Sequence, residues 1–229
     1  MKVTILGTGM VGQTISVRLK ELGYDVTIET RNPEETKKRA EPNPMTGVAF
    51  SDWYKEHSDI ALVAYGQSVE DAELVINATS GGTSLEVLSK IGTNKLTGKV
   101  LLDIANPLDF SQGMPPFLSV CNTNSLAEQI QAKFPQTKVV KSLNTMNAYI
   151  MVHPETIPDD HNVFVSGNDK SAKTIVIDLL KAIGWKESNI IDLGDISTAR
   201  GTEMLLSIWM RLWGVFGHAD FNFHIQKAN

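Results

Sequence analysis

The sequence predicts an α/β fold with a doubly wound, mostly parallel sheet and a smaller C-terminal α/β extension. Short runs rich in aliphatic and β-branched residues alternate with stretches of helical period, which is the pattern of repeated βαβ units. The first run, KVTIL, passes directly into GTGMVG, a glycine pattern that in this context is typical of the first turn of a Rossmann-type sheet. Both observations predict one nucleotide-binding sheet as the main body of the chain.

Eight runs are expected to form the strands of this sheet. Each run is short, apolar and bounded by turn-forming or helical segments. The expected strands are residues 2–6, 25–29, 60–64, 74–77, 100–103, 139–143, 163–166 and 190–192.

Helices are expected in the gaps, beginning with residues 10–22 directly after the glycine pattern. The run 170–183 has apolar residues at helical period and should end at Gly184. The apolar stretch 204–217 is shorter than the ~20 residues that span a bilayer, so we expect a buried helix there. The expected N-terminal caps are Asn32 before Pro33, Thr83 with Glu86, and Ser125 with Glu128.

Length and charge limit the possible organisation and partners. The chain has 229 residues, of which 42% are hydrophobic, enough for one large domain with a small second part. We predict a nucleotide-binding domain over residues 1–145 and a smaller part over residues 146–229 that closes the substrate pocket. The net charge of −5 argues against nucleic acid or an anionic membrane surface as a partner.

Cysteine content and the N-terminal residues bear on the compartment. Cys121 is the single cysteine, which excludes an intramolecular disulfide and fits a reducing compartment. We expect this thiol to be buried and unreactive. The apolar run before the first glycine is too short for a signal peptide, so a cytoplasmic location is expected.

The glycine pattern predicts how a dinucleotide binds. Gly7 permits the tight turn, Gly9 lets the backbone approach a pyrophosphate, and Gly12 allows close packing of helix on strand. The helix that follows supplies free N–H groups and positive potential to the phosphates.

The end of the second strand, in the sequence IETR, bears on the choice of dinucleotide. NAD-specific sheets place an acid there for the ribose 2′-hydroxyl, and Glu29 is one candidate. Side chains alternate along a strand, however, and the position directly before the arginine is Thr30. Thr30 and Arg31 offer a hydroxyl and a guanidinium to a 2′-phosphate. We therefore favour NADP, and expect Glu29 to be a solvated charge at the strand end.

Small and polar residues end two later strands, in VINATSGG and LLDIANP. The carboxyl edge of such a sheet is where ligands bind, so these turns are expected to contact the ribose and nicotinamide. The residues concerned are Ala78, Thr79, Ser80, Ala105, Asn106 and Pro107.

With these motifs, the chain resembles the deazaflavin-dependent NADP reductases, which exchange a hydride between NADP and coenzyme F-420. The resemblance extends over nearly the whole length, in GTGMVG, TRNPEE, VINATSGG, VVKSLNTMNAY, VFVSGND and IWMRLWGVFG. The chain is also similar to the cytosolic oxidoreductase domain of the six-transmembrane metal reductases, which use a flavin. The resemblance implies a small C-terminal part that closes the pocket, a small-molecule redox acceptor and a homodimer.

The resemblance also implies roles for particular residues. It assigns the pyrophosphate to Thr8 and the turn backbone, including Met10 and Val11, and the 2′-phosphate to Thr30 and Arg31. Some relatives have a further lysine where Glu35 stands here, so Lys37 or Lys38 would have to reach back. Asn144, Thr145 and Met146 are placed near the ring pocket.

The chemistry expected is direct hydride transfer without a catalytic protein residue or a metal. The five histidines are scattered in the sequence, and no nucleophile or metal-ligand spacing is present. Hydride transfer between two stacked rings needs orientation and a dry pocket. Dehydrogenases with a proton donor use a larger C-terminal domain than residues 146–229 provide, so that class ranks lower. Two alternatives stay open: an NADP(H)-binding sensor or scaffold without turnover, and a flavin-dependent ferric reductase.

Overall fold

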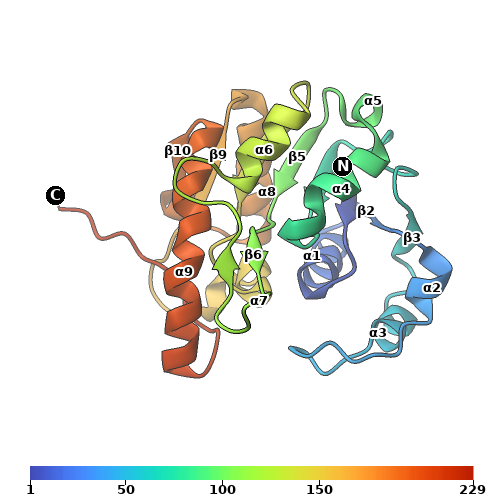
Figure 1. The fold of residues 1–229 in the computed structure, drawn as a ribbon, viewed down its shortest axis with the longest axis horizontal. Helices are drawn as coiled ribbons and strands as arrows, with labels where there is room; N and C mark the ends of the chain where they lie inside the picture. The colour runs from blue at the N-terminus through green and yellow to red at the C-terminus, as the bar shows by residue number, and fades with distance from the viewer. Residues whose placement is uncertain (229) are drawn as a thin grey trace.

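The computed structural model describes residues 1–228, which are organised around an eight-stranded sheet (Figure 1). The strand order is β10-β9-β8-β5-β4-β1-β2-β3, and all neighbours are parallel except β8 and β9. This confirms the predicted doubly wound, mostly parallel sheet. The strands are β1 Lys2–Leu6, β2 Asp25–Thr30, β3 Ala61–Ala64, β4 Leu74–Asn77, β5 Val100–Asp103, β8 Lys138–Ser142, β9 Val163–Gly167 and β10 Ile190–Gly194.

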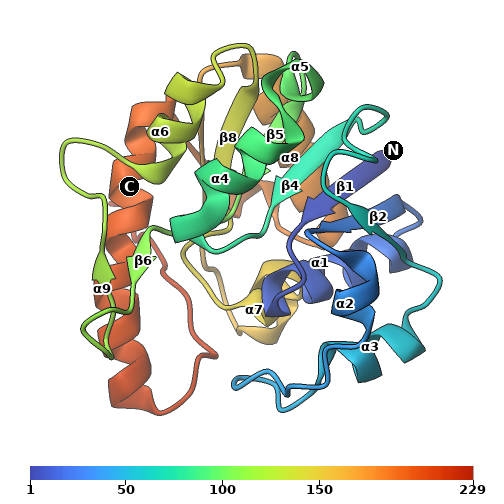
Figure 2. The ribbon, with the colours of Figure 1, turned by 45° about the vertical axis from the view of Figure 1, so that its right-hand side comes forward.

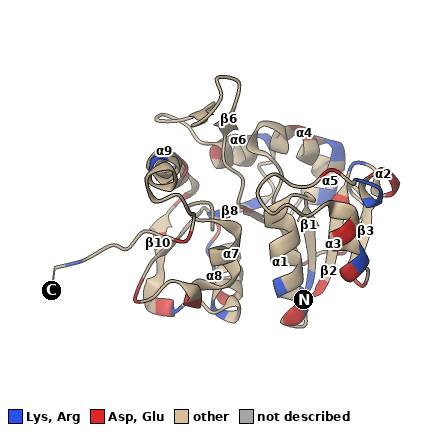
Figure 3. Ribbon diagram, turned by 90° about the horizontal axis from the view of Figure 1, so that it is seen from below, with Lys and Arg blue, Asp and Glu red and all other residues tan. Residues whose placement is uncertain are grey.

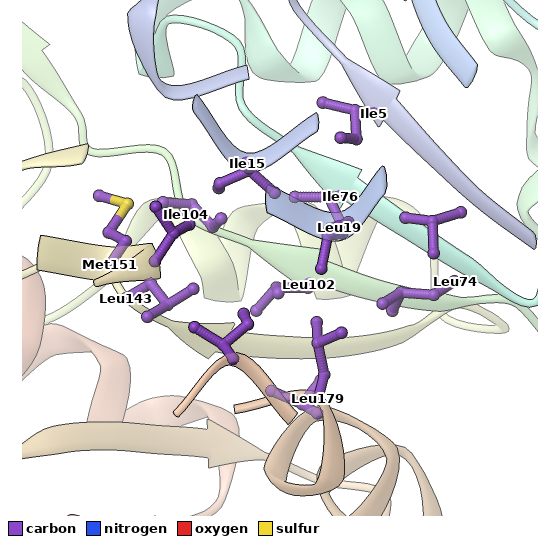
Figure 4. Packing of buried hydrophobic residues seen from close by; sticks show 14 of the residues in the cluster. Ile5, Ile15, Leu19, Leu74, Ile76, Leu102, Ile104, Leu143, Met151 and Leu179 are labelled. Atoms are coloured by element: carbon purple, nitrogen blue, oxygen red, sulfur yellow. The ribbon is translucent and has the colours of Figure 1, made fainter. Parts of the chain in front are cut away.

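Helices cover both faces of the sheet (Figure 2). The core on one face joins α1, α3, α7 and α8 to the sheet, and part of it is shown in Figure 4. The core on the other face joins α4, α5 and α6 to it. The helices are α1 Met10–Glu21, α2 Pro33–Lys37, α3 Phe50–Glu56, α4 Gly81–Ile91, α5 Thr93–Leu96, α6 Leu126–Lys133, α7 Ala148–Val152, α8 Lys170–Ile183 and α9 Ala199–Phe216, with 3-10 turns η1 Pro154–Thr156, η2 Glu187–Asn189 and η3 Ile196–Thr198.

The central strands are buried on both faces because helices lie above and below them. In β4, Leu74 and Ile76 belong to one core, whereas Val75 belongs to the other. This explains why the strands read as continuous apolar runs in the sequence. The predicted division between residues 145 and 146 falls between β8 and α7, and strands on both sides of it share the sheet. A separate closing part therefore stays a prediction.

Two of the three predicted helix caps are present. Asn32 accepts hydrogen bonds from the backbone of Glu34 and Glu35, and Ser125 accepts one from Glu128. The third prediction is wrong, because α4 begins at Gly81 and Thr83 lies inside its first turn. The predicted end of α8 at Gly184 is confirmed by the positive φ of +128° at that glycine.

The segment after β5 and the helix α9 depart from the sequence predictions. A short hairpin of β6 (Leu108–Asp109) and β7 (Phe117–Leu118) forms after β5, in a segment that is not among the eight expected strands. The helix α9 is not buried as a whole, because Ile208 and Val215 are 51% and 78% exposed.

Cys121 is exposed, which contradicts the expectation of a buried thiol. None of the helices described is long and apolar enough to cross a membrane.

Candidate functional site

The predicted site segments meet at one edge of the sheet. Leu6 pairs with both Glu29 and Asn77, and Asn77 in turn pairs with Asp103. Asp103 pairs with Lys141 of β8. The turns after these five parallel strands therefore emerge side by side. We call the part formed by the glycine turn, the end of β2 and α2 the phosphate end, and the part around the turns after β4, β5 and β8 the ring end.

The glycine turn is shaped as the sequence predicts. Gly7 has a φ of +114°, and a Cβ there would lie 2.6 Å from the carbonyl oxygen of Ala78. A Cβ on Gly12 would lie 2.3 Å from the carbonyl oxygen of Gly7. By contrast, no atom lies within 4 Å of a Cβ built on Gly9, which is the N-cap of α1 and makes no side-chain cap. The uncapped helix N-terminus and the open space at Gly9 fit a bound pyrophosphate.

An arginine that the sequence analysis missed lies against the glycine turn. The carbonyl oxygen of Thr8 accepts a hydrogen bond of 2.9 Å from Nη2 of Arg39. It also accepts one of 2.9 Å from Nε2 of Gln13. Arg39 follows α2 in the sequence and its guanidinium lies 5.0 Å from the ring centre of Phe50. Its position depends on contacts between distant segments, so no local pattern in the sequence identifies it.

Glu29 is fully buried, which corrects the expectation of a solvated charge. Its carboxylate accepts hydrogen bonds from the backbone N–H groups of Gly66 (2.6 Å), Ser68 (2.6 Å) and Val69 (3.2 Å), and from the Ser68 hydroxyl (2.9 Å). The loop after β3 surrounds the carboxylate with donors, and this offsets its burial. Glu29 is therefore occupied in stabilising that loop and is not available to a ribose.

The other residues predicted to bind at the end of β2 differ in their solvent exposure and in whether they already have a partner. Thr30 is buried, and its Oγ1 lies 3.0 Å from Oγ1 of Thr36 on α2. Arg31 is exposed. Lys37 bonds to Glu34 over 2.9 Å, and this hydrogen bond raises the pKa of Lys37. Arg31 has no ion pair among the described residues and is therefore a freer cation than Lys37.

The ring end contains a cavity of about 210 Å³. We call it the ring cavity. It is lined by Val11, Ala78, Thr79, Ser80, Gly81, Ile104, Ala105, Asn106, Leu108, Phe110, Asn144, Met146, Met151, Leu206 and Trp209. None of these side chains is ionisable. The structure thus brings together seven of the nine residues predicted at the ends of β4, β5 and β8, whereas Pro107 and Thr145 are buried and do not line the cavity.

Hydrogen bonds between the strand-end turns hold the walls of the ring cavity. The side chains of Asn106 and Asn144 face each other, and Asn144 donates to Oδ1 of Asn106 over 2.9 Å. Nδ2 of Asn106 donates to the carbonyl of Asn144. The hydroxyl of Thr79 donates to Asn77 over 2.7 Å and is therefore already engaged. The walls are also close-packed, because a Cβ on Gly81 would lie 1.9 Å from the carbonyl oxygen of Asn106.

Trp209 and Leu206 bring α9 into the site, which the sequence analysis did not predict. Both side chains are buried and line the ring cavity. Nε1 of Trp209 is buried and has no hydrogen-bond partner in the described chain. An unpaired buried donor is costly, so a partner supplied by a ligand would stabilise this position.

Three charged residues form a fully buried cluster behind the ring cavity, which we call the buried triad. Nζ of Lys141 lies 2.8 Å from Oδ2 of Asp103 and 2.9 Å from Oε1 of Glu203 on α9. Burial lowers the pKa of Lys141, but the two carboxylates outweigh this effect and raise it. Glu203 also accepts backbone hydrogen bonds from Leu126 and Ala127 in the first turn of α6. The triad therefore ties α9 and α6 to the sheet. In the sequence, a charged residue within each of the apolar strand runs VLLD and VVKS is the feature that indicates a buried ion pair.

Histidines and acidic residues form no further reactive cluster in residues 1–228. No group of three or more His, Cys, Asp or Glu side chains there is placed to hold a metal ion. None of the five histidines lines the ring cavity. His161 is buried and bonds to the carbonyl of Pro154 and to Asn222.

Comparisons with known proteins agree with this geometry. The family model for F420-dependent NADP oxidoreductases matches residues 2–107. A crystal structure from Arthrobacter sp. FB24, provisionally named an F420-dependent NADP reductase, is 54% identical with a TM-score of 0.93, and the alignment covers 99% of this chain and 100% of that one. The F420-dependent NADP reductase of Methanocaldococcus jannaschii is 26% identical over 93% of this chain and 92% of its own.

A second group of relatives is larger than this chain. Metalloreductase STEAP3 of Rattus norvegicus is 26% identical over 93% of this chain, but the match covers only 38% of the metalloreductase. The chain thus spans less than two-fifths of that protein. The similarity to the Arthrobacter structure, by contrast, covers nearly the whole of both chains. The chain belongs to the family of F420-dependent NADP oxidoreductases.

Proposed function

We propose that the chain is an NADP-dependent oxidoreductase that transfers a hydride between NADPH and a deazaflavin such as coenzyme F-420. The observation that carries this proposal is the ring cavity, which lies beside the glycine turn and has no ionisable lining residue. A reaction with an alcohol or imine would need a proton donor there. Direct transfer between two rings needs none.

The residues of the chain orient the nucleotide and keep water away. Backbone N–H groups at the start of α1 would hold the pyrophosphate, and Arg31, which follows Thr30 at the end of β2, would hold the 2′-phosphate. When bound, the nicotinamide supplies the hydride and the deazaflavin accepts it. Met146, Leu206 and Trp209 give the ring cavity apolar walls. Such walls exclude water and favour a near-attack arrangement of the rings.

The size of the ring cavity bears on the acceptor. Its volume of about 210 Å³ is below the ~300 Å³ at which ligand pockets usually begin, which favours one ring inside the cavity over two. We infer that the acceptor ring stacks at the mouth of the cavity, beside the exposed Phe110. The same limited volume favours the second candidate function, an NADP(H)-binding sensor without turnover. A flavin in place of the deazaflavin, as in a ferric reductase, is a further outcome of the experiment below.

The experiment is to mix NADPH with one acceptor at a time: coenzyme F-420, FMN, FAD and a ferric chelate. We expect F-420 to be reduced, with a primary isotope effect when the transferred hydrogen of NADPH is deuterium. Replacement of any single histidine should change turnover by less than about ten-fold, since a general acid contributes 10²–10⁴. Binding of NADPH without oxidation by any acceptor would favour the sensor instead.

We also propose that the chain forms a homodimer in the cytoplasm. The outer face of α9 exposes Met204, Ile208, Val215 and Phe216, which is unusual for a helix left in water. The exposed thiol of Cys121 fits a reducing compartment. Light scattering during gel filtration measures the mass. A monomer, or a dimer that persists when Ile208 is replaced by Asp, would contradict this interface.

A further inference from the structure

We propose that Arg39 is a second cation of the 2′-phosphate site and a specificity-determining residue for NADPH over NADH. The inference rests on the proposed function to the extent that an NADP nucleotide binds at the glycine turn. It does not depend on the identity of the acceptor.

Contacts with the glycine turn and with the start of α3 hold Arg39 in place. Its Nη2 donates to the carbonyl of Thr8 over 2.9 Å, and its guanidinium lies 5.0 Å from the ring centre of the buried Phe50. The backbone carbonyl of Arg39 accepts a hydrogen bond of 3.1 Å from Ser51 N. The side chain is thus fixed between the start of α3 and the glycine turn. A guanidinium has five N–H donors, and the contact with Thr8 uses one of them.

The contact with Thr8 places Arg39 beside the end of β2. Leu6 pairs with Glu29, and Gly7 N donates to the carbonyl of Glu29 over 3.2 Å, so Thr8 lies beside the end of β2. The end of β2 is where sheets of this type meet the 2′ position of the adenine ribose. Arg39 is therefore placed next to the 2′-phosphate of NADP rather than next to the nicotinamide.

Arg31 and Arg39 lie on either side of α2 in the sequence. Thr36 on α2 contacts Thr30, and Arg39 N donates to the carbonyl of Thr36 over 3.1 Å. Arg31 lies near Tyr65 and Glu86, on the side of α4. Both guanidinium groups therefore belong to residues placed next to the end of β2, Arg31 by its position in the chain and Arg39 by its contact with Thr8. Two such groups match the oxygens of a phosphate dianion well.

Lys37 is one of the two lysines, with Lys38, that the resemblance implied for this role, and it is less free than Arg39. Lys37 is paired with Glu34 over 2.9 Å and lies 6.0 Å from the ring centre of Tyr54. Figure 3 shows acidic and basic residues side by side on α2 and α3, so most cations there have an acidic neighbour. Arg39 has no carboxylate within ion-pair distance in the described residues, and its charge is therefore free for a phosphate.

The experiment measures binding of four ligands to the full chain by calorimetry: NADPH, NADH, 2′-AMP and 5′-AMP. Arg39→Met removes the guanidinium and its charge and keeps an unbranched, flexible side chain at this position. We expect NADPH and 2′-AMP to bind at least ten-fold more weakly, and NADH and 5′-AMP to change by less than two-fold. Lys37→Met is the matched control and should change NADPH binding by less than about three-fold. Arg39→Lys should recover part of the loss.

Several outcomes would overturn the inference. Equal losses for NADPH and NADH in Arg39→Met would mean that Arg39 only supports the glycine turn. An unchanged NADPH affinity, or a larger loss in Lys37→Met, would also reject it. If Arg39→Met does not fold, Arg39→Gln takes its place as the variant without the charge, and an unaltered preference for NADPH over NADH in Arg39→Gln rejects the inference. A wild-type chain that binds NADPH but reduces no acceptor would reject the proposed reaction alone, because the nucleotide preference of the variants is still measured.

Discussion

The phosphate end and the ring end place their charged residues in different surroundings. Arg31 and Arg39 at the phosphate end are exposed, and both have donors to spare for a ligand. At the ring end the charges lie behind the cavity in the buried triad, where Lys141 already pairs with two carboxylates. The cavity itself has no ionisable lining. The cations of the phosphate end are therefore accessible to a ligand, whereas the charges of the ring end pair with one another inside the protein.

This difference predicts opposite costs of mutation. Exposed cations contribute little to stability because water and salt screen them. A buried ion cluster contributes strongly once formed, since removal of one partner leaves the others uncompensated in a medium of low polarity. Substitutions at the ring end should thus affect folding, and those at the phosphate end should affect ligand binding.

The largest effect is expected for Lys141→Met. It leaves Asp103 and Glu203 buried without a counter-charge, which should lower the free energy of unfolding by about 3–5 kcal/mol. Urea denaturation measures this value. The control is Lys90→Met, which removes an exposed pair with Glu86 and should cost less than about 1 kcal/mol. Similar losses in both variants would show that the two ends do not differ in this way.

The packing of the ring end is tested by Gly81→Ala. A Cβ there would meet the carbonyl oxygen of Asn106 at 1.9 Å, so the turns after β4 and β5 would have to separate, at a cost of about 1–3 kcal/mol. Gly82 is the matched control, because it lies in the same helix with no atom within 4 Å of its Cβ position. Gly82→Ala should leave stability unchanged or raise it by up to about 1 kcal/mol. Thermal unfolding of both variants decides the point.

The phosphate end is tested by Arg31→Ala. Loss of a charge-assisted contact costs about 1.5–3 kcal/mol, so NADPH should bind at least ten-fold more weakly. NADH should be nearly unaffected, and the unfolding midpoint should not move. Titration of nucleotide fluorescence gives both affinities. Equal weakening of the two nucleotides would reject the assignment of Arg31 to the 2′-phosphate.

The smallest effect concerns pH. Hydrogen bonds from Arg200 lower the pKa of Glu128 below its usual value of 4.5. A lowered folded-state pKa means that the stabilisation is present above about pH 4.5 and is lost as the pH falls through the folded-state value. The difference in melting temperature between the wild type and Glu128→Gln should therefore shrink in acid. A difference that stays constant from neutral pH into acid would contradict this pairing.

The sheet could be predicted from the sequence because its strands are local apolar runs with clear ends. The runs at 2–6, 74–77 and 100–103 coincide with β1, β4 and β5. The turns after these strands could also be predicted, since parallel strands bring their carboxyl ends to one edge.

The environment of single side chains could not be predicted in the same way. Glu29 is buried because a loop about 40 positions further on supplies its donors, and Arg39 is held by a turn that lies 31 positions before it. The sequence of α9 is apolar enough to predict a buried helix. It does not show which apolar side chains the rest of the chain covers, and so it does not predict the exposed outer face. Contacts between distant segments decide all three cases.

The surroundings of Glu29 and Thr30 have a consequence for how the family can diversify. An NAD-preferring descendant would need an acid facing the ribose, yet Glu29 points into a nest of four donors on the other face of β2. An acid at position 30 would enter the buried contact with Thr36. A single substitution at either position therefore cannot provide an acid for the ribose without the loss of buried hydrogen bonds. Lineages descended from this protein should exchange acceptors, through the residues that α9 contributes to the ring cavity, more readily than they exchange nucleotides.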